Sequence, residues 1–527
     1  MRFSKILWIT AILAVNPGFG QSSSQQMSAS AAARFLDQAT WGPTPASIAQ
    51  LQQMGIDKWL NAQFALNTSD IPDQPILDST GKSNNTIGPV QAAFYQNTVT
   101  QPDQLRQRVA FALSQIWVVS HTGVEAAYAF PPYWRIFRDN AFGNYRDLIQ
   151  AVTLSPAMGR YLNMANNHKA NPAKNTSANE NYARELMQLF TLGLTQLNPD
   201  GTPVLDKNQN PVPTYDQTVV TNMAKVLTGW TYPTAPSAKQ KTSNPEYYFG
   251  SMFAVETEHD ASAKTIFSNV AIPAGQTAEQ DLNSLLDALM AQPEMAPFVS
   301  QQLIQHLVSS NPSPQYVARV SNVFANDGKG VTGNLQAVIA AILTDPEARA
   351  GDDSTAMTAT ALSSNAGFGH LREPVLLMAN LLRGLNATLT ANSVINRQSA
   401  LLGEDLFNPA SVFSYFSPQY RAANGLLAPE FQIYTTQSAV NRANIVNAIL
   451  YGNIDKGTTV DLTPFTAQAG TTASLLNYIS SVFLHGSMPA ALEQAVTDAV
   501  NAASTVTAKT QAALYVVLTS DEYQIIH

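Results

Sequence analysis

The stretch 179–193 holds the densest set of side chains in the chain that could perform acid–base chemistry. At about 100° per residue along a helix, its polar side chains fall on one arc. These side chains are Glu180, Asn181, Arg184, Glu185 and Gln188. The opposite arc is apolar, and a glycine at the end is typical of a helix terminus. Because a carboxylate on such a face can act as a general base, the first four residues of this set are our candidate catalytic residues.

The polar face has three interpretations, which the sequence leaves open. Glu180 and Arg184 are spaced as an i,i+4 ion pair on a solvated helix surface, which stabilises a helix by only a few tenths of a kcal/mol (~0.2–0.5). Alternatively, the face belongs to a buried structural network in which Arg106 or Arg108 is a partner. In the third interpretation the face lines a cleft and forms a site.

A second candidate is the pair His259-Asp260, which lies in polar, irregular sequence. A histidine beside carboxylates can bind a metal or transfer protons. The alternative is a loop histidine that hydrogen-bonds the backbone. A further histidine, His168, lies in an Asn-rich loop ahead of the 179–193 helix, and we expect it to be structural or exposed.

Aromatic residues gather in the segment 406–429, which is predicted to be a loop. Exposed aromatic rings there could stack on sugar rings or anchor a protein interface, whereas buried rings would only pack the loop. The residues are Phe407, Phe413, Tyr415, Phe416 and Tyr420.

The composition excludes several classes of function. Charged residues make up 13% of the chain, against about 25% in a typical globular protein. The net charge is −8 and no long basic run occurs, so we set nucleic-acid binding aside. The chain has no cysteine, which excludes thiol catalysis and cysteine-ligated metals. We therefore expect no metal and no cofactor.

The N-terminus has the three parts of a secretory signal. Two positive charges within 1–5 precede a short apolar run over 6–15, and small residues at 18–20 suit cleavage before Gln21. The apolar run is well short of the ~20 residues that span a membrane. We expect residues 1–20 to be removed and the protein to be exported, to the periplasm or the outside of the cell, without a membrane span.

Helical periodicity dominates the rest of the sequence. We predict a mainly α fold, with residues 21–527 forming one large multi-helical body. A loop-rich insertion is expected over about 198–273, beginning with a turn-rich segment, 198–215, that suits a small β-hairpin.

Several stretches together resemble the bacterial family called domain of unknown function 1800. The resemblance runs in order along almost the whole chain. The matching stretches are 34–44 (RFLDQATWGPT), 105–108 (LRQR), 179–193, 227–230 (LTGW), 259–260 with 264–265, 372–374 (REP) and 408–413 (NPASVF).

The resemblance implies an exported, mainly helical protein with no assigned reaction. Members of the family are often encoded beside a secreted protein that resembles phosphatases and sulfatases, which implies a possible partner. Many relatives have histidines where this chain has Ser114, Ile116 and Phe190, so a metal role in those relatives does not carry over.

Two functional classes follow. The first is binding or assembly of a secreted partner or a cell-surface polymer such as a glycan. The second is a secreted hydrolase that uses the polar face of the 179–193 helix together with His259-Asp260. The absence of a complete nucleophile or metal motif favours the first.

Overall fold

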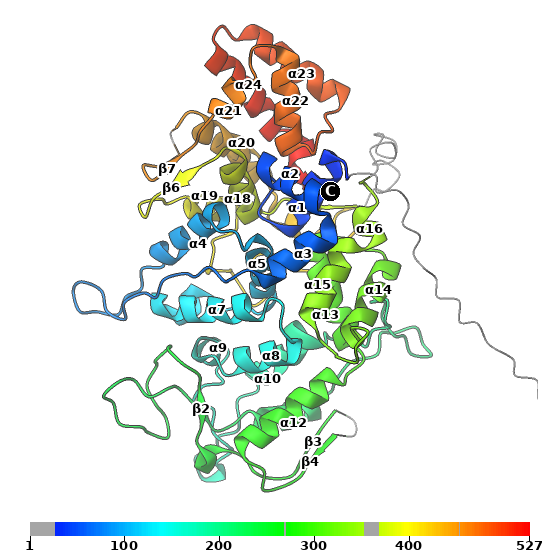
Figure 1. Cartoon of the computed structure of the whole chain (residues 1–527). Coiled ribbons are helices and arrows are strands. Elements are labelled where there is room, and N and C mark those ends of the chain that lie inside the picture. Colours follow the sequence, from blue (N-terminus) through cyan, green and yellow to red (C-terminus); the bar gives the residue numbers. More distant parts are fainter. Residues whose placement is uncertain (1–26, 268–269, 353–367, 453) are drawn as a thin grey trace, which may run out of the picture.

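The computed structural model describes residues 27–267, 270–352, 368–452 and 454–527. The predicted signal, residues 1–20, lies outside this part of the chain. The fold is mainly α, as predicted, with strands only in small two-stranded sheets (Figure 1). Within the described residues, no helix is both long and apolar enough to cross a membrane.

The N-terminal third is a group of helices around a continuous apolar core. Ser28 caps the first helix, and Thr44 and Ser47 cap the second reciprocally. The apolar side chains of this group, including Phe35, Trp41 and Phe111, are buried together. The helices are α1 (Ala29–Ala39), α2 (Pro45–Met54), α3 (Ile56–Ala65), α4 (Gly88–Thr100), α5 (Gln104–Ile116), α6 (His121–Val124), η1 (Ala127–Ala129), α7 (Phe130–Asn140), α8 (Tyr145–Thr153) and α9 (Pro156–Tyr161).

The predicted 179–193 helix is divided into two parts. An α-helical turn is followed by a π-helix, and Gly193 ends the stretch with φ of +79°. Among its described residues, the segment 198–273 holds one α-helix, one 3-10 helix of three residues and strands of two or three residues, so it is loop-rich as expected. The elements are η2 (Pro172–Lys174), α10 (Asn181–Glu185), η3 (Leu186–Thr191), α11 (Gln217–Val226), β1 (Trp230–Thr231), β2 (Phe253–Ala254), η4 (Glu256–Glu258), β3 (Lys264–Ile266) and β4 (Val270–Ile272).

The turn-rich segment after Gly193 forms an irregular hairpin. Isolated bridges pair Thr195 with Pro213, Leu197 with Pro203 and Leu205 with Pro211. Prolines lack the N–H that a continuous ladder requires, which accounts for isolated bridges in place of strands.

A second helical group follows the hairpin region and packs against the first. It consists of α12 (Ala278–Met290), α13 (Met295–Leu307), α14 (Pro314–Ala325), α15 (Leu335–Thr344) and α16 (Pro346–Arg349). In Figure 1 α13 to α16 lie to the right of α5 and α7, whereas α12 lies below them near α8; α13 contacts α5 directly.

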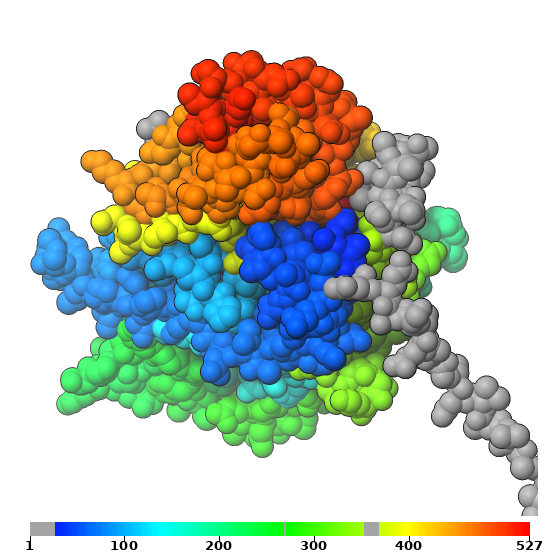
Figure 2. All heavy atoms as spheres, turned by 45° about the horizontal axis from the view of Figure 1, so that its top comes forward, coloured from blue at the N-terminus to red at the C-terminus, as the bar shows by residue number. Residues whose placement is uncertain are grey.

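The C-terminal third covers the opposite side of the N-terminal helices, and Figure 2 shows it massed on one side of the molecule. Strand β8 pairs with β5, so the end of the chain returns to the centre. The elements are β5 (His370–Leu371), α18 (Pro374–Gly384), β6 (Thr388–Leu389), α19 (Asn396–Leu401), η5 (Pro429–Ile433), α20 (Thr436–Leu450), β7 (Thr458–Thr459), α21 (Thr463–Thr466), α22 (Thr472–Phe483), α23 (Ala490–Ala502), α24 (Val506–Leu518), α25 (Asp521–Gln524) and β8 (Ile525–Ile526).

Candidate functional site

The carboxylate of Glu180 joins the start of α10 to the start of α11. It accepts hydrogen bonds from Gln217 Nε2 at 2.8 Å, Thr221 Oγ1 at 2.9 Å and Arg184 Nη2 at 3.2 Å. The Gln217 hydrogen bond is the main cause that lowers the pKa of Glu180. The side chains of Arg184 and Glu180 are 40% and 32% exposed, so this is a partly solvated polar link between two helices.

The other two candidates on this face have fewer contacts. Asn181 is exposed and donates to Asn163 Oδ1 at 3.2 Å. Glu185 is half-buried, burial raises its pKa, and within the described chain its Oε2 has no hydrogen-bond partner. Arg106 and Arg108 donate to backbone oxygens elsewhere, so they do not form the expected network with this helix.

His259 is buried at the other end of α11. Its Nδ1 lies 3.0 Å from Thr228 O, and its Nε2 lies 3.1 Å from Asp281 Oδ2. The ammonium group of Lys264 also donates to Asp281, and none of these three polar side chains is exposed. The neighbouring Asp260 accepts from the backbone N–H of Ser262 at 3.0 Å.

The candidates at the two ends of α11 share no contact among those described. Glu180 bonds to residues near the helix start, and His259 bonds to a residue just beyond the helix end. A ten-residue helix is about 15 Å long. The structure therefore does not bring Glu180 and His259 together in one reaction centre. No group of three His, Asp or Glu side chains in the described residues could hold a metal ion.

Charged residues of the matching stretches are instead buried in the centre of the molecule. Arg372 holds both oxygens of Asp37 at 2.8 Å, while His485 Nε2 lies 3.0 Å and Asn380 Nδ2 3.1 Å from the same carboxylate. Burial alone would raise the pKa of Asp37, but Arg372 and His485 hold it below its usual range. This cluster joins α1, β5, α18 and the turn after α22.

A second buried cluster contains two acidic side chains that face each other. Gln115 Nε2 lies 3.2 Å from both oxygens of Glu373, and Glu404 accepts from the backbone N–H of Val375 at 2.7 Å. Burial raises the pKa of Glu373 to about 7, and burial together with the Glu373 charge raises that of Glu404. Two like charges at close range cannot both ionise easily, so one carboxyl remains protonated at neutral pH.

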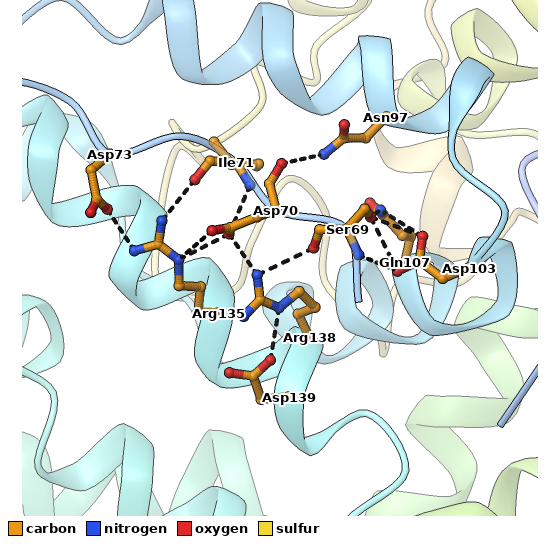
Figure 3. Close-up of polar contacts among 10 residues, drawn as sticks. All are labelled: Ser69, Asp70, Ile71, Asp73, Asn97, Asp103, Gln107, Arg135, Arg138 and Asp139. Carbon is orange, nitrogen blue, oxygen red and sulfur yellow. Dashed lines mark hydrogen bonds and ion pairs between the residues drawn. The ribbon is translucent and has the colours of Figure 1, made fainter. Parts of the chain in front are cut away.

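A third polar cluster fastens the loop after α3 to the helices beneath it (Figure 3). Arg135 and Arg138, both on α7, point to Asp70, and Arg138 Nη1 lies 2.6 Å from its Oδ1. Ser69 donates to Asp103 on the other side of the loop. The side chains of Asp70 and its partners satisfy one another, so the cluster holds the loop rather than presenting free groups.

Among the surface hollows of ligand size in the described residues is a groove of about 430 Å³, within the ~300–1,000 Å³ of typical ligand sites. It lies between the end of η3, the hairpin that follows, α13 and the segment 413–421. We call it the amide groove. Its lining residues are Gln188, Leu189, Gly193, Leu194, Thr195, Leu197, Gly201, Pro203, Phe298, Gln301, Gln302, Phe413, Ser417, Pro418, Gln419 and Arg421.

Two glycines shape the amide groove. A Cβ at Gly193 would lie 2.9 Å from the ring of Phe298, and a Cβ at Gly201 would lie 3.1 Å from both Gln301 and Val317. Both glycines have positive φ, of +79° and +78°, which L side chains adopt at a cost. These positions therefore let the hairpin approach α13 and α14 closely.

The lining is mostly apolar and nearly neutral, and its polar groups are chiefly side-chain amides. In the described part of the chain, the side-chain amides of Gln188, Gln301 and Gln419 make no hydrogen bond. Gln302 is 7% exposed and its Nε2 also lacks a partner. The one charged lining residue, Arg421, donates to the Gly425 carbonyl oxygen at 2.7 Å.

Of the aromatic cluster predicted over 406–429, the structure exposes only part. Phe413 is 46% exposed and lines the amide groove, whereas Tyr420 is 36% exposed and lies outside it. Phe416 is buried, and Phe407 packs against Phe94 with ring centroids 6.1 Å apart.

Comparison with known proteins identifies the family. Residues 34–525 match a family described as "Protein of unknown function (DUF1800)". The match covers nearly the whole chain, so the protein belongs to the DUF1800 family, as its motifs predicted. No curated protein and no solved structure matched in the same comparisons.

Sequence reasoning missed the α13 side of the groove. Phe298, Gln301 and Gln302 lie on α13, which the sequence analysis did not single out. The adjacent pair of glutamines was the available signal, because an apolar helix face has no need of two neighbouring amides.

Proposed function

We propose that the protein is an exported binding protein that holds a segment of a neutral polysaccharide in the amide groove. The main observation in support is that this groove combines amide side chains that have no described hydrogen-bond partner with an exposed aromatic ring and almost no charge. Export is inferred from the signal-like N-terminus, residues 1–20.

The amides supply the polar half of the proposed recognition. Each glutamine side chain offers two N–H donors and an oxygen acceptor, which match the hydroxyl groups of a sugar. Gln188, Gln301 and Gln419 present these groups without breaking any hydrogen bond among the described residues. A buried donor that has no acceptor, such as Gln302 Nε2, costs desolvation free energy. A ligand hydroxyl that accepts its hydrogen bond would recover that free energy.

The exposed ring of Phe413 supplies the apolar half. An aromatic face packs well against an apolar surface such as the C–H face of a sugar ring. Phe298 and Leu194 add to the apolar surface of the groove, and Leu194 is 59% exposed. A solvent-facing ring beside free amides therefore favours a polyhydroxylated, uncharged chain over an ionic ligand.

Two alternatives compete with this proposal. A peptide from a secreted partner, such as the phosphatase- or sulfatase-like protein suggested by the family resemblance, could also use amides and an aromatic anchor. A hydrolase that uses Glu180, Asn181, Arg184, Glu185, His259 and Asp260 as one site gains no support, because their described contacts lie at two ends of α11.

The test uses the exported full chain after signal removal, with its N-terminus established by mass spectrometry. Retention of the protein would be measured by affinity electrophoresis in gels that contain neutral glucans, mannans or acidic polysaccharides. We expect at least one neutral polysaccharide to retard the protein, and Phe413→Ala to weaken that binding about tenfold, or roughly 1.4 kcal/mol.

Tyr420→Ala is the matched control, because Tyr420 is an exposed aromatic of the same segment outside the amide groove. Its binding should equal that of the wild type. Equal losses from the two variants, or retention only in acidic polysaccharides, would contradict the proposal. Capture of a secreted protein that depends on Phe413, without glycan binding, would support the peptide alternative.

A further inference from the structure

Three side chains that lie far apart in the sequence meet at the surface near β1. Ser243 Oγ lies 3.0 Å from Nε2 of His168, and Nδ1 of the same ring lies 3.1 Å from Glu258 Oε2. Hydroxyl, imidazole and carboxylate in this order are the parts of a serine hydrolase triad. We propose that Ser243 and His168 form a catalytic site for ester cleavage, with Glu258 as positioning residue. This site shares no residue with the amide groove, so the proposal of ester cleavage can be tested independently of polysaccharide binding.

The histidine is held by backbone contacts on both sides. The side chain of the preceding Asn167 accepts from the backbone N–H of Asn179 at 2.8 Å and donates to its carbonyl oxygen at 3.2 Å. The backbone N–H of the following Lys169 donates to the carbonyl oxygen of Glu258 at 2.8 Å. The loop that carries His168 is thereby fixed directly to the residue that supplies the carboxylate.

The serine is positioned by its neighbour Asn244, which is 2% exposed. The backbone N–H of Asn244 donates to Thr231 Oγ1 at 2.8 Å, and its side chain donates to the Tyr232 carbonyl oxygen at 2.8 Å. Its own carbonyl oxygen accepts from Asn166, which lies on the His168 loop. A shared set of hydrogen bonds therefore fixes the separation between Ser243 and the imidazole.

The contacts assign a role to each ring nitrogen. If the Ser243 hydroxyl donates to Nε2, the proton of the neutral ring must sit on Nδ1. Nδ1 has no aligned hydrogen-bond partner in the described residues, and Glu258 Oε2, at 3.1 Å, lies off its N–H direction. Catalytic hydrogen bonds are often poorly aligned without substrate and tighten when it binds. The carboxylate is therefore placed to hold this tautomer.

The proposed reaction proceeds in two balanced steps. The oxygen of Ser243 attacks the ester carbonyl carbon, its proton passes to Nε2 of His168, and that proton then leaves with the alcohol as the C–O bond breaks. Water next attacks the acyl-serine, loses a proton to the same nitrogen and releases the carboxylic acid, which restores the Ser243 hydroxyl.

The setting indicates the class of substrate. Ser243 is exposed, and the side chains of His168 and Glu258 are 38% and 30% exposed. An exposed nucleophile can reach a short acyl ester displayed on a large molecule. In the described part of the structure, the backbone N–H groups of Thr242 and Ser243 donate to no other group, so they are available to the oxyanion that forms.

The test is labelling of the mature full chain with a fluorophosphonate probe, followed by peptide mass spectrometry, and hydrolysis of p-nitrophenyl acetate. We expect the label on Ser243, no label in Ser243→Ala, and a loss of at least about tenfold in labelling rate in His168→Asn. Ser251→Ala removes an exposed serine of the same segment that lacks a histidine partner, and it should label like the wild type. Glu258→Gln should lower kcat at nearly unchanged KM, which a purely structural role would not do.

Absence of label from wild-type Ser243, under conditions that label a known serine hydrolase, would overturn the proposal. So would an ester-cleavage rate that is unchanged in both Ser243→Ala and His168→Asn. Circular dichroism of each variant separates a loss of reactivity from a loss of folding, and His168→Asn tests the base without altering the nucleophile.

Discussion

The buried cluster around Asp37 and the amide groove use polar side chains in opposite ways. In the cluster, Arg372, His485 and Asn380 contact one carboxylate that is shielded from water. In the groove, the amides of Gln188, Gln301 and Gln419 face the surface with no described partner. One region satisfies its polar groups internally, and the other leaves them available.

The difference separates motif residues that are buried inside the fold from neutral side chains that face the surface. A charge in a low-dielectric interior is tolerated only when it is paired, so each buried charge fixes its partner's position. Arg34, Asp37 and Arg372 lie in matching stretches, are buried, and each pairs with an opposite charge. These residues hold segments from distant parts of the chain together, while neutral side chains that carry no such constraint form the candidate ligand surface.

The largest expected effect comes from breaking the buried cluster. Asp37→Ala leaves Arg372 buried without its carboxylate, which should lower the free energy of unfolding by about 3–5 kcal/mol. Urea unfolding at pH 7 measures this change. The low folded-state pKa of Asp37 also means that its stabilisation is present above its usual pKa of about 4 and is lost as the pH falls further. A loss below about 1 kcal/mol, the range of surface pairs, would show that the cluster does not hold the fold.

Glu373→Gln should change how stability depends on pH. The folded-state pKa of Glu373 is about 7, against an ordinary value of 4.5, so its stabilisation is complete below about pH 4.5 and is lost as the pH rises to about 7. The wild type should lose a few kcal/mol of unfolding free energy over this range as the Glu373–Glu404 pair titrates, at ~1.4 kcal/mol per pKa unit. The Glu373→Gln variant should lose less, because one of the two acidic groups is gone.

Thermal unfolding at pH 5 and pH 8 distinguishes these curves. We expect the difference in Tm between Glu373→Gln and the wild type, variant minus wild type, to be larger at pH 8 than at pH 5. An equal change in Tm between pH 5 and pH 8 in the two proteins would mean that the fold does not favour the protonated form of Glu373.

The smallest expected effect concerns the polar face of α10. Glu180→Gln removes a charge from a partly exposed link, so unfolding should change by about 1 kcal/mol or less. Retardation in polysaccharide gels should equal that of the wild type. If this variant folded normally yet abolished polysaccharide binding, the helix face would be the site and the comparison drawn above would fail.

Local signals predicted the fold class but not the amide groove. Helical periodicity gave a mainly α chain, and Gly193 ends its stretch as expected, because both depend on residues close in sequence. The switch from α10 to the π-helix η3 was missed, since an apolar arc fits either hydrogen-bond pattern. The amide groove was missed because hairpin, α13 and 413–421 meet only through tertiary packing.

The candidate catalytic residues chosen from the sequence were mostly charged. The pair His259-Asp260 was a candidate site, but His259 is buried against Asp281, a residue on α12 whose contribution no local spacing revealed. Phe413 was included among the candidate sugar-stacking residues, and its 46% exposure in the groove agrees with that hypothesis without testing it.

The most direct test of the account measures polysaccharide affinity and stability in the same three proteins: wild type, Phe413→Ala and Tyr420→Ala. The account predicts one free energy of unfolding for all three within about 0.5 kcal/mol, because both substitutions remove exposed rings. It predicts that neutral-polysaccharide affinity falls about tenfold only in Phe413→Ala. Unchanged affinity in Phe413→Ala, in a protein that binds the polysaccharide, would place binding outside the amide groove and contradict the account.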